Sequence, residues 1–237
     1  INNSPNFLGI TNLLIKLNPM FKTKITIFSL TIFVLSLFPI TNATAAPSNK
    51  PFKLNCKSTK AKGHTVKNVT PPEVKAPFKN RIINLSTNCG EIVIEAFGVN
   101  APVTVTAMTA LAKGGFFDQT LCHRLTTEGI YVLQCGDPTA TGRGGPNFFY
   151  NDENLPPATD DNYPAGTVAM ANSGANTNGS QFFIVYEDTS LSPNYTIWGK
   201  VVRGLEIVKA IAKDGVVDGK TDGLPKRKIA IERVKVR

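Results

Sequence analysis

Histidine is scarce in this chain of 237 residues, and its scarcity excludes several kinds of site. Only His64 and His123 are present, and they lie far apart in the sequence. A metal site built from several imidazole ligands therefore has no support. The sequence also lacks Gly-x-Ser-x-Gly and Cys-x-x-Cys motifs, which argues against a hydrolase nucleophile elbow and a dithiol redox centre. We predict no metal and no other cofactor.

Two further patterns, a glycine-rich stretch and two pairs of adjacent acids, do not indicate a binding or catalytic site. The glycine-rich stretch 142–145 lacks the Lys-Ser/Thr ending of a phosphate-binding loop and no helix follows it, so we interpret it as a plain turn. Adjacent acids occur at 152–153 and 160–161. Neighbours on a strand point to opposite faces, so we interpret these acids as solvated loop charges and not as an acid/base pair.

Acidic residues are nearly absent from the first third of the chain. Residues 1–45 carry three lysines and no acid, and residues 46–80 carry eight lysines and only Glu73. Residues 81–237 carry 15 basic and 16 acidic residues, so this part is close to neutral. A nucleic-acid enzyme would place its basic stripe on the folded domain, and we expect no nucleic-acid partner. Residues 20–80 are either a solvated tail or a contact for an anionic membrane or cell-wall polymer.

Residues 20–45 have the pattern of an export signal. Met20 opens a short basic start, an uncharged apolar run follows from Ile25 to Ile40, and small residues end the segment at Ala45. The run is shorter than the roughly 20 residues that a spanning helix needs. We therefore predict a cleaved signal peptide, with an uncleaved N-terminal anchor as the alternative. The protein is expected to be exported, either to the cell envelope or to the medium.

The chain begins with Ile1 and not with methionine, so Met20 is the candidate start, and residues 1–19 would then be an upstream extension of the reading frame. Residues 46–80, rich in Lys, Pro, Thr and Asn without an apolar period, are predicted to be an extended linker. The pattern changes at residue 81, and residues 81–237 are predicted to form the folded domain. We expect a monomer by default.

Turn residues divide this domain into short elements. Pro102 opens an apolar helical stripe that Gly114 ends, and Gly204 and Gly215 bracket a second stripe. Alternating or short apolar runs predict strands at 83–87, 91–95, 131–133, 167–170, 181–186 and 229–236. Two helices among many short strands indicate a mainly β domain with a closed antiparallel barrel.

Three segments carry a specific resemblance. The first reads Cys-His-Arg-Leu at 122–125 and Val-Leu-Gln-Cys-Gly-Asp-Pro at 132–138. The second reads Thr-Gly-Arg-Gly-Gly at 141–145, with Asp-Glu-Asn-Leu at 152–155. The third runs from Met-Ala-Asn-Ser-Gly at 170–174 to Gly-Ser-Gln-Phe-Phe-Ile at 179–184. Over about residues 81–237 the chain resembles the cyclophilin-type peptidyl-prolyl cis-trans isomerases, and it looks like their actinobacterial exported branch.

The resemblance implies a closed eight-stranded barrel capped by two helices, and proline-containing peptides or proteins as substrates. It matches Arg124 to the catalytic arginine and Gln134 to the glutamine beside it. The substrate-binding positions that it implies are Tyr131, Val132, Ala171, Asn172, Gln181, Phe183, Leu191, Tyr195 and Trp198. Four of these depart from the usual family residue and keep the pocket apolar while changing its shape: Tyr131, Val132, Tyr195 and Trp198.

These residue types suit isomerisation of an Xaa–Pro bond, in which no bond is made or broken. The prolyl nitrogen regains its lone pair when the bond twists, and a fixed cation there favours the twisted state. Arg124 offers a permanently charged fork of donors. The alternative is a module that grips proline segments with little turnover, which the longer loop before Tyr131 would permit. The intact Arg124 and Gln134 argue against that alternative.

Four cysteines occur in a chain with an export signal, which permits disulfides in three connectivities. Cys122 and Cys135 lie at the outer ends of two strands that would form one hairpin, close enough for a bridge. That pairing leaves Cys56 for Cys89, and free buried thiols are the alternative. We predict both bridges, Cys122 with Cys135 and Cys56 with Cys89.

Overall fold

The computed structural model describes residues 52–70 and 73–237. The chain divides into two units at Asn49, and all described residues belong to the second. The upstream extension and the export signal predicted over residues 1–45 lie outside the described residues. Within the described part, no helix is both long and apolar enough to cross a membrane.

Strands β1 (Arg81–Thr87) and β2 (Gly90–Ala96) form the hairpin that the alternating pattern predicts. Gly90 follows the turn with a φ of 125°, a conformation that glycine adopts without a side-chain clash. The Thr87 hydroxyl donates to the Gly90 carbonyl at 2.6 Å and closes the turn. The inward faces of both strands are buried through Ile83, Leu85, Ile92 and Ile94.

Helix α1 (Pro102–Lys113) begins at the predicted proline and ends before Gly114. No side chain of its own cap accepts the free N–H groups. The Glu153 carboxylate does so instead, accepting from Val103 N at 3.4 Å and from Thr104 N at 2.6 Å. The interpretation of Glu153 as a solvated loop charge is therefore wrong, because an acidic side chain at a helix N-terminus satisfies donors and matches the helix dipole.

Helix α2 (Leu205–Asp214) follows Gly204 and ends at Gly215, as predicted. Gly204 has a φ of 93°, and a Cβ there would lie 2.3 Å from the Glu91 carbonyl oxygen. Only glycine allows the chain to turn so close to β2. The apolar stripe of the helix is buried against the sheet through Ile207, Val208 and Ile211.

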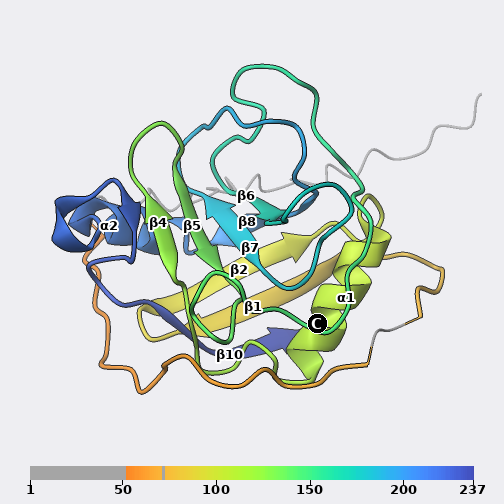
Figure 1. The fold of residues 1–237 in the computed structure, drawn as a ribbon, viewed down its shortest axis with the longest axis horizontal. Helices are drawn as coiled ribbons and strands as arrows, with labels where there is room; N and C mark the ends of the chain where they lie inside the picture. Colours follow the sequence, from red (N-terminus) through yellow and green to blue (C-terminus); the bar gives the residue numbers. More distant parts are fainter. Residues whose placement is uncertain (1–51, 71–72) are drawn as a thin grey trace, which may run out of the picture. The chain divides into compact units, whose positions relative to one another are not determined.

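The remaining strands wrap around these elements in one antiparallel sheet (Figure 1). The sheet order is β3-β10-β1-β2-β8-β6-β7-β5-β4-β9, and a short 3₁₀ helix, Val217–Gly219, precedes β9. The strands not yet given are β3 (Thr120–Leu121), β4 (Arg124–Thr126), β5 (Val132–Cys135), β6 (Thr167–Met170), β7 (Phe182–Val185), β8 (Ile197–Arg203), β9 (Asp222–Gly223) and β10 (Ala230–Val236).

The sheet differs in detail from the predicted closed eight-stranded barrel, because it contains ten strands. Two of them, β3 and β9, have two residues each. Strand β3 pairs with β10 at one end of the order, whereas β4 pairs with β5 and β9 near the other end. Only Cys122 and His123 separate β3 from β4, so one bent segment joins the first strand of the order to the strand next to its last. At this bend the two sides of the curled sheet are therefore joined by the backbone itself and not by a ladder of paired strands.

The core forms two clusters on opposite sides of the central strands. The larger one fills the barrel and includes Phe116, Leu133, Phe182, Ile184 and Trp198. The smaller one lies on the outer face of β5, β6 and β7 and consists of Val132, Tyr163, Ala169, Phe183 and Val185, with partly buried neighbours at its edge. Because successive strand residues alternate faces, the same three strands supply both clusters.

The described part of the predicted linker follows the barrel surface, and residues 52–70 are called the strap below. In Figure 1 the strap is the orange segment that runs from the side of α2 toward α1. Asn88 in the β1–β2 turn holds one end, exchanging hydrogen bonds of 2.8 and 3.0 Å with the Lys57 backbone. Near the other end, Lys67 Nζ donates to the Gly115 carbonyl at 2.7 Å. The strap therefore has defined contacts with the folded domain.

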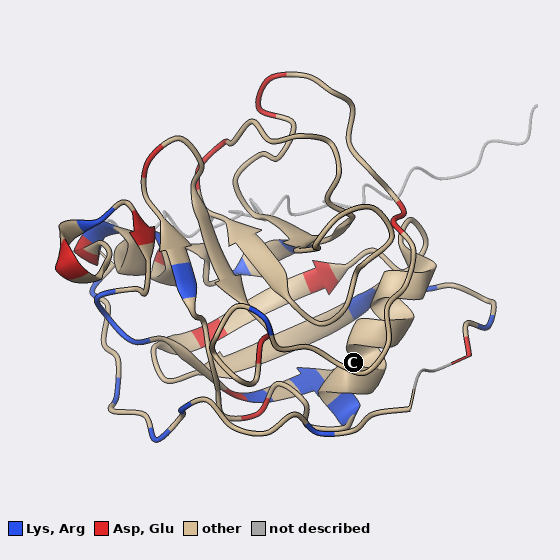
Figure 2. Ribbon diagram, in the orientation of Figure 1, with Lys and Arg blue, Asp and Glu red and all other residues tan. Residues whose placement is uncertain are grey.

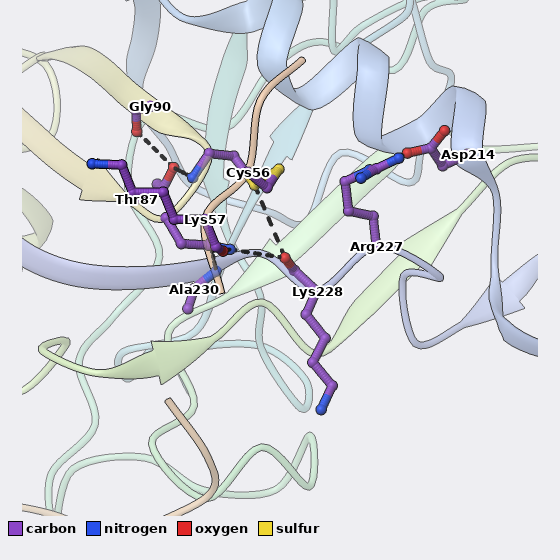
Figure 3. The surroundings of a disulfide bond; sticks show 10 residues. Cys56, Lys57, Thr87, Gly90, Asp214, Arg227, Lys228 and Ala230 are labelled. Atoms are coloured by element: carbon purple, nitrogen blue, oxygen red, sulfur yellow. Dashed lines mark hydrogen bonds and ion pairs between the residues drawn. A yellow bond between two sulfur atoms is a disulfide. The ribbon is translucent and has the colours of Figure 1, made fainter. Parts of the chain in front are cut away.

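The cysteines are joined in the two predicted pairings, Cys56 with Cys89 and Cys122 with Cys135. The first bridge fixes the strap to the β1–β2 turn and lies against the Lys228 backbone, whose carbonyl oxygen is 3.9 Å from Cys89 Sγ (Figure 3). The second bridge is positioned by the bend between β3 and β4. Cys122 donates its backbone N–H to Ile229 at 3.0 Å and lies outside the β4–β5 ladder.

Candidate active site

Strands β4 and β5 place the two proposed catalytic side chains opposite each other. Arg124 and Gln134 are partners in the antiparallel register, and side chains of directly paired residues share one face of a sheet. Arg124 Nη1 donates to Gln134 Oε1 at 3.3 Å. The hairpin alone therefore brings together two residues that are ten positions apart in the sequence.

A chain of hydrogen bonds continues from this pair. Gln134 Nε2 donates to Gln181 Oε1 at 2.8 Å, and Gln181 Nε2 donates to the Gly144 carbonyl at 2.8 Å. Each amide is thus oriented by the next partner, so the oxygen of Gln134 faces the guanidinium. A fixed amide oxygen at Nη1 limits the rotamers of Arg124.

The loop that supplies the Gly144 carbonyl is organised by a buried carboxylate. Asp137 accepts from Thr139 N at 2.7 Å, Thr141 N at 3.0 Å and Gly142 N at 2.7 Å. Burial alone would favour the neutral acid, but hydrogen bonds from the Thr139 hydroxyl and from the backbone N–H groups of Thr139, Gly144 and Gly142 outweigh it and lower the pKa of Asp137. A Cβ on Gly144 would lie 2.0 Å from Asp137 Oδ1. The glycine-rich stretch is therefore a turn, as interpreted, and one that packs tightly on this acid.

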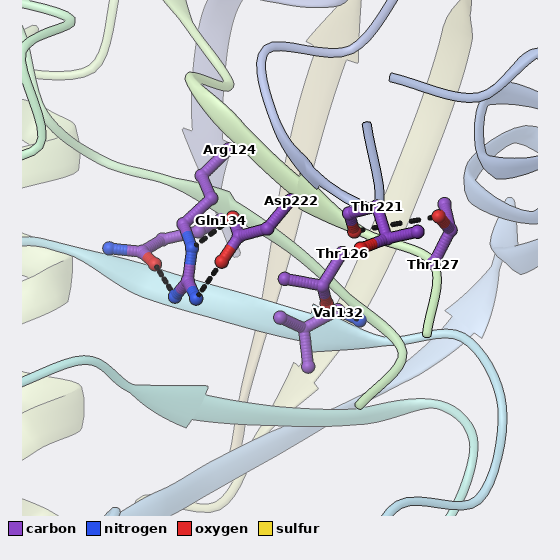
Figure 4. A network of polar contacts seen from close by, with 7 residues as sticks. All are labelled: Arg124, Thr126, Thr127, Val132, Gln134, Thr221 and Asp222. Atoms are coloured by element: carbon purple, nitrogen blue, oxygen red, sulfur yellow. Dashed lines mark hydrogen bonds and ion pairs between the residues drawn. The ribbon is translucent and has the colours of Figure 1, made fainter. Parts of the chain in front are cut away.

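Asp222 of β9 is the part of the site that the sequence did not reveal. Its Oδ1 accepts from Arg124 Nε and its Oδ2 accepts from Arg124 Nη2, both at 2.8 Å (Figure 4). These hydrogen bonds raise the pKa of Arg124 and lower the pKa of Asp222. Both partners are therefore ionised at neutral pH, and the guanidinium lies between Asp222 and Gln134.

A small pocket opens beside this guanidinium. It has a volume of about 160 Å³, which is smaller than the sites that take drug-sized ligands. Six of its nine lining residues have apolar or aromatic side chains, and Arg124, Gln134 and Asn172 are the polar ones. The lining consists of Arg124, Ile130, Val132, Gln134, Ala171, Asn172, Phe183, Leu191 and Tyr195. We call it the β5–β7 pocket.

Aromatic packing makes the floor of the β5–β7 pocket rigid. Phe183 is 5% exposed, and its ring meets Tyr195 edge to face with centroids 5.6 Å apart. Tyr163 lies beneath both rings, accepts from Tyr195 N at 3.1 Å and donates to the Tyr195 carbonyl at 3.1 Å. A fixed apolar floor suits a small saturated ring better than a flexible chain.

Asn172 follows the end of β6 at one side of the pocket. Its Nδ2 donates to the Asn194 carbonyl at 2.8 Å, and its Oδ1 accepts from Gly174 N at 3.3 Å, so the side chain is held on both sides. Within residues 52–70 and 73–237, the backbone N–H and carbonyl of Asn172 have no hydrogen-bond partner. They are available to an extended peptide lying along this edge.

Most of the predicted site residues meet at the β5–β7 pocket, and three do not line it. Gln181 lies behind Gln134 and lines a neighbouring polar cavity of about 300 Å³ with residues 142–146. The assignment of Tyr131 to the pocket is wrong, because it faces the opposite side of the strand and packs on Tyr186. Ile130 lines the pocket instead.

Trp198 also lies elsewhere. It is 1% exposed in the barrel core and meets Phe182 edge to face at 5.8 Å. Phe182 and Phe183 are neighbours on β7, so they face opposite sides of the sheet. The assignment of Trp198 to the pocket wall is therefore wrong, because it packs on the core side.

His123 precedes Arg124 and is buried at 7% exposure. Burial lowers its pKa, so the imidazole is neutral at pH 7 and Arg124 is the positive charge at the pocket. Among the described residues, no group of three or more His, Cys, Asp or Glu side chains has the arrangement of a metal site.

Known proteins resemble the chain in both sequence and fold. Residues 82–236 match the family described as cyclophilin type peptidyl-prolyl cis-trans isomerase/CLD. A protein of Mycobacterium leprae called probable peptidyl-prolyl cis-trans isomerase B is 40% identical over 197 residues, which are 77% of this chain and 67% of the relative. A protein of the same name from Mycobacterium tuberculosis H37Rv is 40% identical over 209 residues, which are 80% and 68%.

The solved cyclophilin-type isomerase of Cryptosporidium parvum has a similar fold. It superimposes with a TM-score of 0.59 and 29% identity over 67% of this chain and 98% of its own. A second structure of that isomerase, determined in the presence of the dipeptide Ala-Pro, has a TM-score of 0.57 and covers 66% of this chain and 98% of its own. The match over residues 82–236 spans the barrel except Arg81, both helices and every residue of the β5–β7 pocket. This chain therefore belongs to the cyclophilin-type peptidyl-prolyl cis-trans isomerase family.

Proposed function

We propose that this chain isomerises Xaa–Pro bonds in exported polypeptides, with the proline ring in the β5–β7 pocket. One observation carries the proposal: a guanidinium held by two partners borders a pocket of about 160 Å³ whose lining residues are mainly aliphatic and aromatic. Arginine has five N–H donors, and three of them bind Asp222 and Gln134. Two donors, one on Nη1 and one on Nη2, remain for a substrate.

The free donors act on the state in which the amide is twisted. The barrier to rotation is about 18–20 kcal/mol because the prolyl nitrogen lends its lone pair to the carbonyl. In the twisted state this lone pair returns to the nitrogen, which becomes a hydrogen-bond acceptor. Arg124 then binds the twisted state more strongly than either planar isomer, and such a difference lowers the barrier. Because its partners already fix the guanidinium, little reorganisation is needed.

The apolar wall and the edge at Asn172 hold the two sides of the bond. Phe183, Val132 and Leu191 enclose the pyrrolidine ring, while the backbone of Asn172 pairs with the peptide before it. A chain held at both points rotates only at the bond between them. The structure of the Cryptosporidium parvum isomerase determined in the presence of the dipeptide Ala-Pro supports a proline-containing peptide as the substrate.

Replacement of the guanidinium tests the assignment. We expect Arg124→Ala to lower kcat/KM on a short proline peptide by about 10²–10³-fold, as loss of a preorganised donor does in other enzymes. Arg227→Ala is the matched control, because Arg227 pairs with Asp214 away from the pocket. A folded Arg124→Ala protein with the wild-type rate would contradict the mechanism. A wild-type protein that binds the peptide without accelerating cis-trans exchange would instead support the alternative, a module that binds proline segments with little turnover.

Export is the second part of the proposal. It is supported by the signal pattern at residues 20–45 and by disulfides at all four cysteines, since such bridges persist mainly in oxidising compartments. N-terminal sequencing of protein from the culture medium and the envelope should find Ala46 as the first residue. An intact N-terminus in the membrane pellet would support the anchor. Recovery in the cytoplasm with four alkylatable thiols would contradict export.

Contact with an anionic surface of the envelope is the third part. The strap carries five lysines and no acid, and all five are exposed along one side of the barrel (Figure 2). Sedimentation with anionic lipid vesicles and with purified cell wall should show binding that weakens as salt rises. Changing Lys53, Lys57, Lys60 and Lys62 to Gln should reduce it at least tenfold. Equal binding by that variant would contradict a role for the strap.

A further inference from the structure

The Arg124–Asp222 contact differs from an ordinary surface ion pair. The carboxylate binds the guanidinium side-on through Nε and Nη2, each at 2.8 Å. Such a paired contact fixes the plane of the guanidinium as well as its position. Gln134 holds only Nη1, at 3.3 Å. The better-placed of the two partners is therefore the one outside the family motifs of the sequence.

The loop that carries Asp222 is itself tied to β4. Thr127 donates to the Thr221 carbonyl through its backbone N at 2.8 Å and through its hydroxyl at 3.4 Å (Figure 4). Strand β9 pairs Asp222 with Thr126 and Gly223 with Leu125. The base of the loop is closed by a bridge between Val216 and Pro225. Asp222 thus follows any movement of the strand that carries Arg124, and the spacing between the two side chains is preserved.

Without this carboxylate Arg124 would be loosely held. Its side chain is 40% exposed, and a long exposed side chain populates several rotamers. The other ionisable groups near the guanidinium are Tyr195 and His123. Burial lowers the pKa of His123, which is neutral at pH 7. Among the described residues, Asp222 is the only acidic side chain that hydrogen-bonds or ion-pairs with the guanidinium.

We propose that Asp222 is a positioning residue for prolyl isomerisation, holding the Arg124 guanidinium so that its free N–H groups meet the twisted amide. This inference rests on the proposed function. Asp222 acts through Arg124 and does not touch the substrate. Its removal should therefore lower kcat and leave KM nearly unchanged, because Arg124 acts in the twisted state and the pocket that binds the ring stays intact.

The test compares Asp222→Asn, Asp222→Ala and Asp222→Glu. We expect kcat/KM to fall about fivefold for Asn and about tenfold for Ala, and Glu to retain at least half of the wild-type value, because only Glu restores the charge. Asp214→Asn is the matched control, since Asp214 makes a similar exposed pair with Arg227, and it should retain the wild-type rate. Melting temperature checks that each variant is folded.

A second readout follows the guanidinium directly. In a ¹⁵N spectrum, the Arg124 Nε–H signal of the wild type should be shifted and protected from exchange. Asp222→Asn and Asp222→Ala should lose both properties, and Asp222→Glu should keep them. A merely structural effect of the loop would lower stability without this pattern of loss and rescue.

Three outcomes overturn the inference: wild-type kcat/KM in folded Asp222→Ala, a raised kcat, or a loss that falls on KM alone. Each can be told apart from failure of the proposed function, which Arg124→Ala tests. An inactive Arg124→Ala protein beside a fully active Asp222→Ala protein would remove the role of Asp222 and leave the mechanism intact.

Discussion

Loss of the Cys122–Cys135 bridge should destabilise the barrel while leaving its chemistry nearly intact. The perturbation is the double variant Cys122→Ala/Cys135→Ala, in which both sites are buried at 5% and 1% exposure. The bridged residues are 13 positions apart. A loop of that size corresponds to about 3 kcal/mol of stability when the bridge restricts the unfolded chain.

The expected fall in melting temperature follows from the size of the domain. In a domain of this size each 1 kcal/mol shifts the midpoint by about 2–4 °C, so the double variant should melt about 6–12 °C below the wild type. Thermal unfolding followed by circular dichroism measures the shift under non-reducing conditions. At 25 °C the variant should keep kcat/KM within about threefold of wild type, because Asp222 and Gln134 still hold Arg124.

Two results would refute this reasoning. A change in melting temperature below about 2 °C would show that the bridge does not restrict the unfolded chain. A loss of kcat/KM beyond tenfold in a fully folded variant would show that the bridge, and not the side-chain contacts, positions Arg124.

Four other outcomes are expected. Cys56→Ala/Cys89→Ala should free the strap, so that trypsin cuts it at least tenfold faster while kcat/KM is unchanged. Phe183→Ala should lower the free energy of unfolding by about 3–5 kcal/mol and also raise KM, measured by urea unfolding and peptide kinetics. Trp198 is the only tryptophan, so its emission should shift on unfolding in guanidinium and stay constant when a proline peptide binds. Burial lowers the pKa of His123 in the folded protein. Below the unfolded pKa of about 6.5 the unfolded chain therefore binds more protons than the folded one, and the free energy of unfolding falls as pH decreases. In urea titrations at several pH values, His123→Gln should make this fall less steep.

Local signals explain why much of the fold could be predicted from the sequence. Pro102 and Gly114 mark the two ends of α1, and Gly204 and Gly215 bracket α2. These residues act through their own backbone conformation, so a single sequence is enough to recognise them. The β1–β2 hairpin was predictable for the same reason, because its alternation and its turn lie within 16 consecutive positions, 81–96.

Other features depend on long-range contacts and had no local signal. Asp222 meets Arg124 across 98 positions, in a loop whose sequence resembles any polar turn. Strands β3 and β9 have two residues each, which is too short for an alternating pattern to be visible. The strap has no apolar period, and its place on the barrel depends on Asn88 and on a disulfide.

Tyr131 and Trp198 were assigned to the wrong face of the sheet. This error shows a different limit of the sequence, which is the difficulty of deciding to which face a strand residue points. Ile130 lies on the pocket side and Tyr131 on the opposite side. A shift of one residue moves every side chain to the other face of a sheet. The alternation of Ile130 with Val132 and Gln134 was a signal that could have identified the correct residue.

The pairing of β1 with β10 also determines the order in which the chain can fold. Ile83 pairs with Val236, so the first strand of the barrel stays without one neighbour until β10 has docked. Cys56 and Cys89, only 33 positions apart, can join before β10 docks, once the chain is in an oxidising compartment. The strap and the first hairpin therefore form an early crosslinked unit with an open strand edge, a state in which long-range β pairing is slow and prone to aggregation. Docking of β10 ends this exposure, and a chain truncated after Arg233, which lacks the partners of Ile83 and Leu85, should remain in that state.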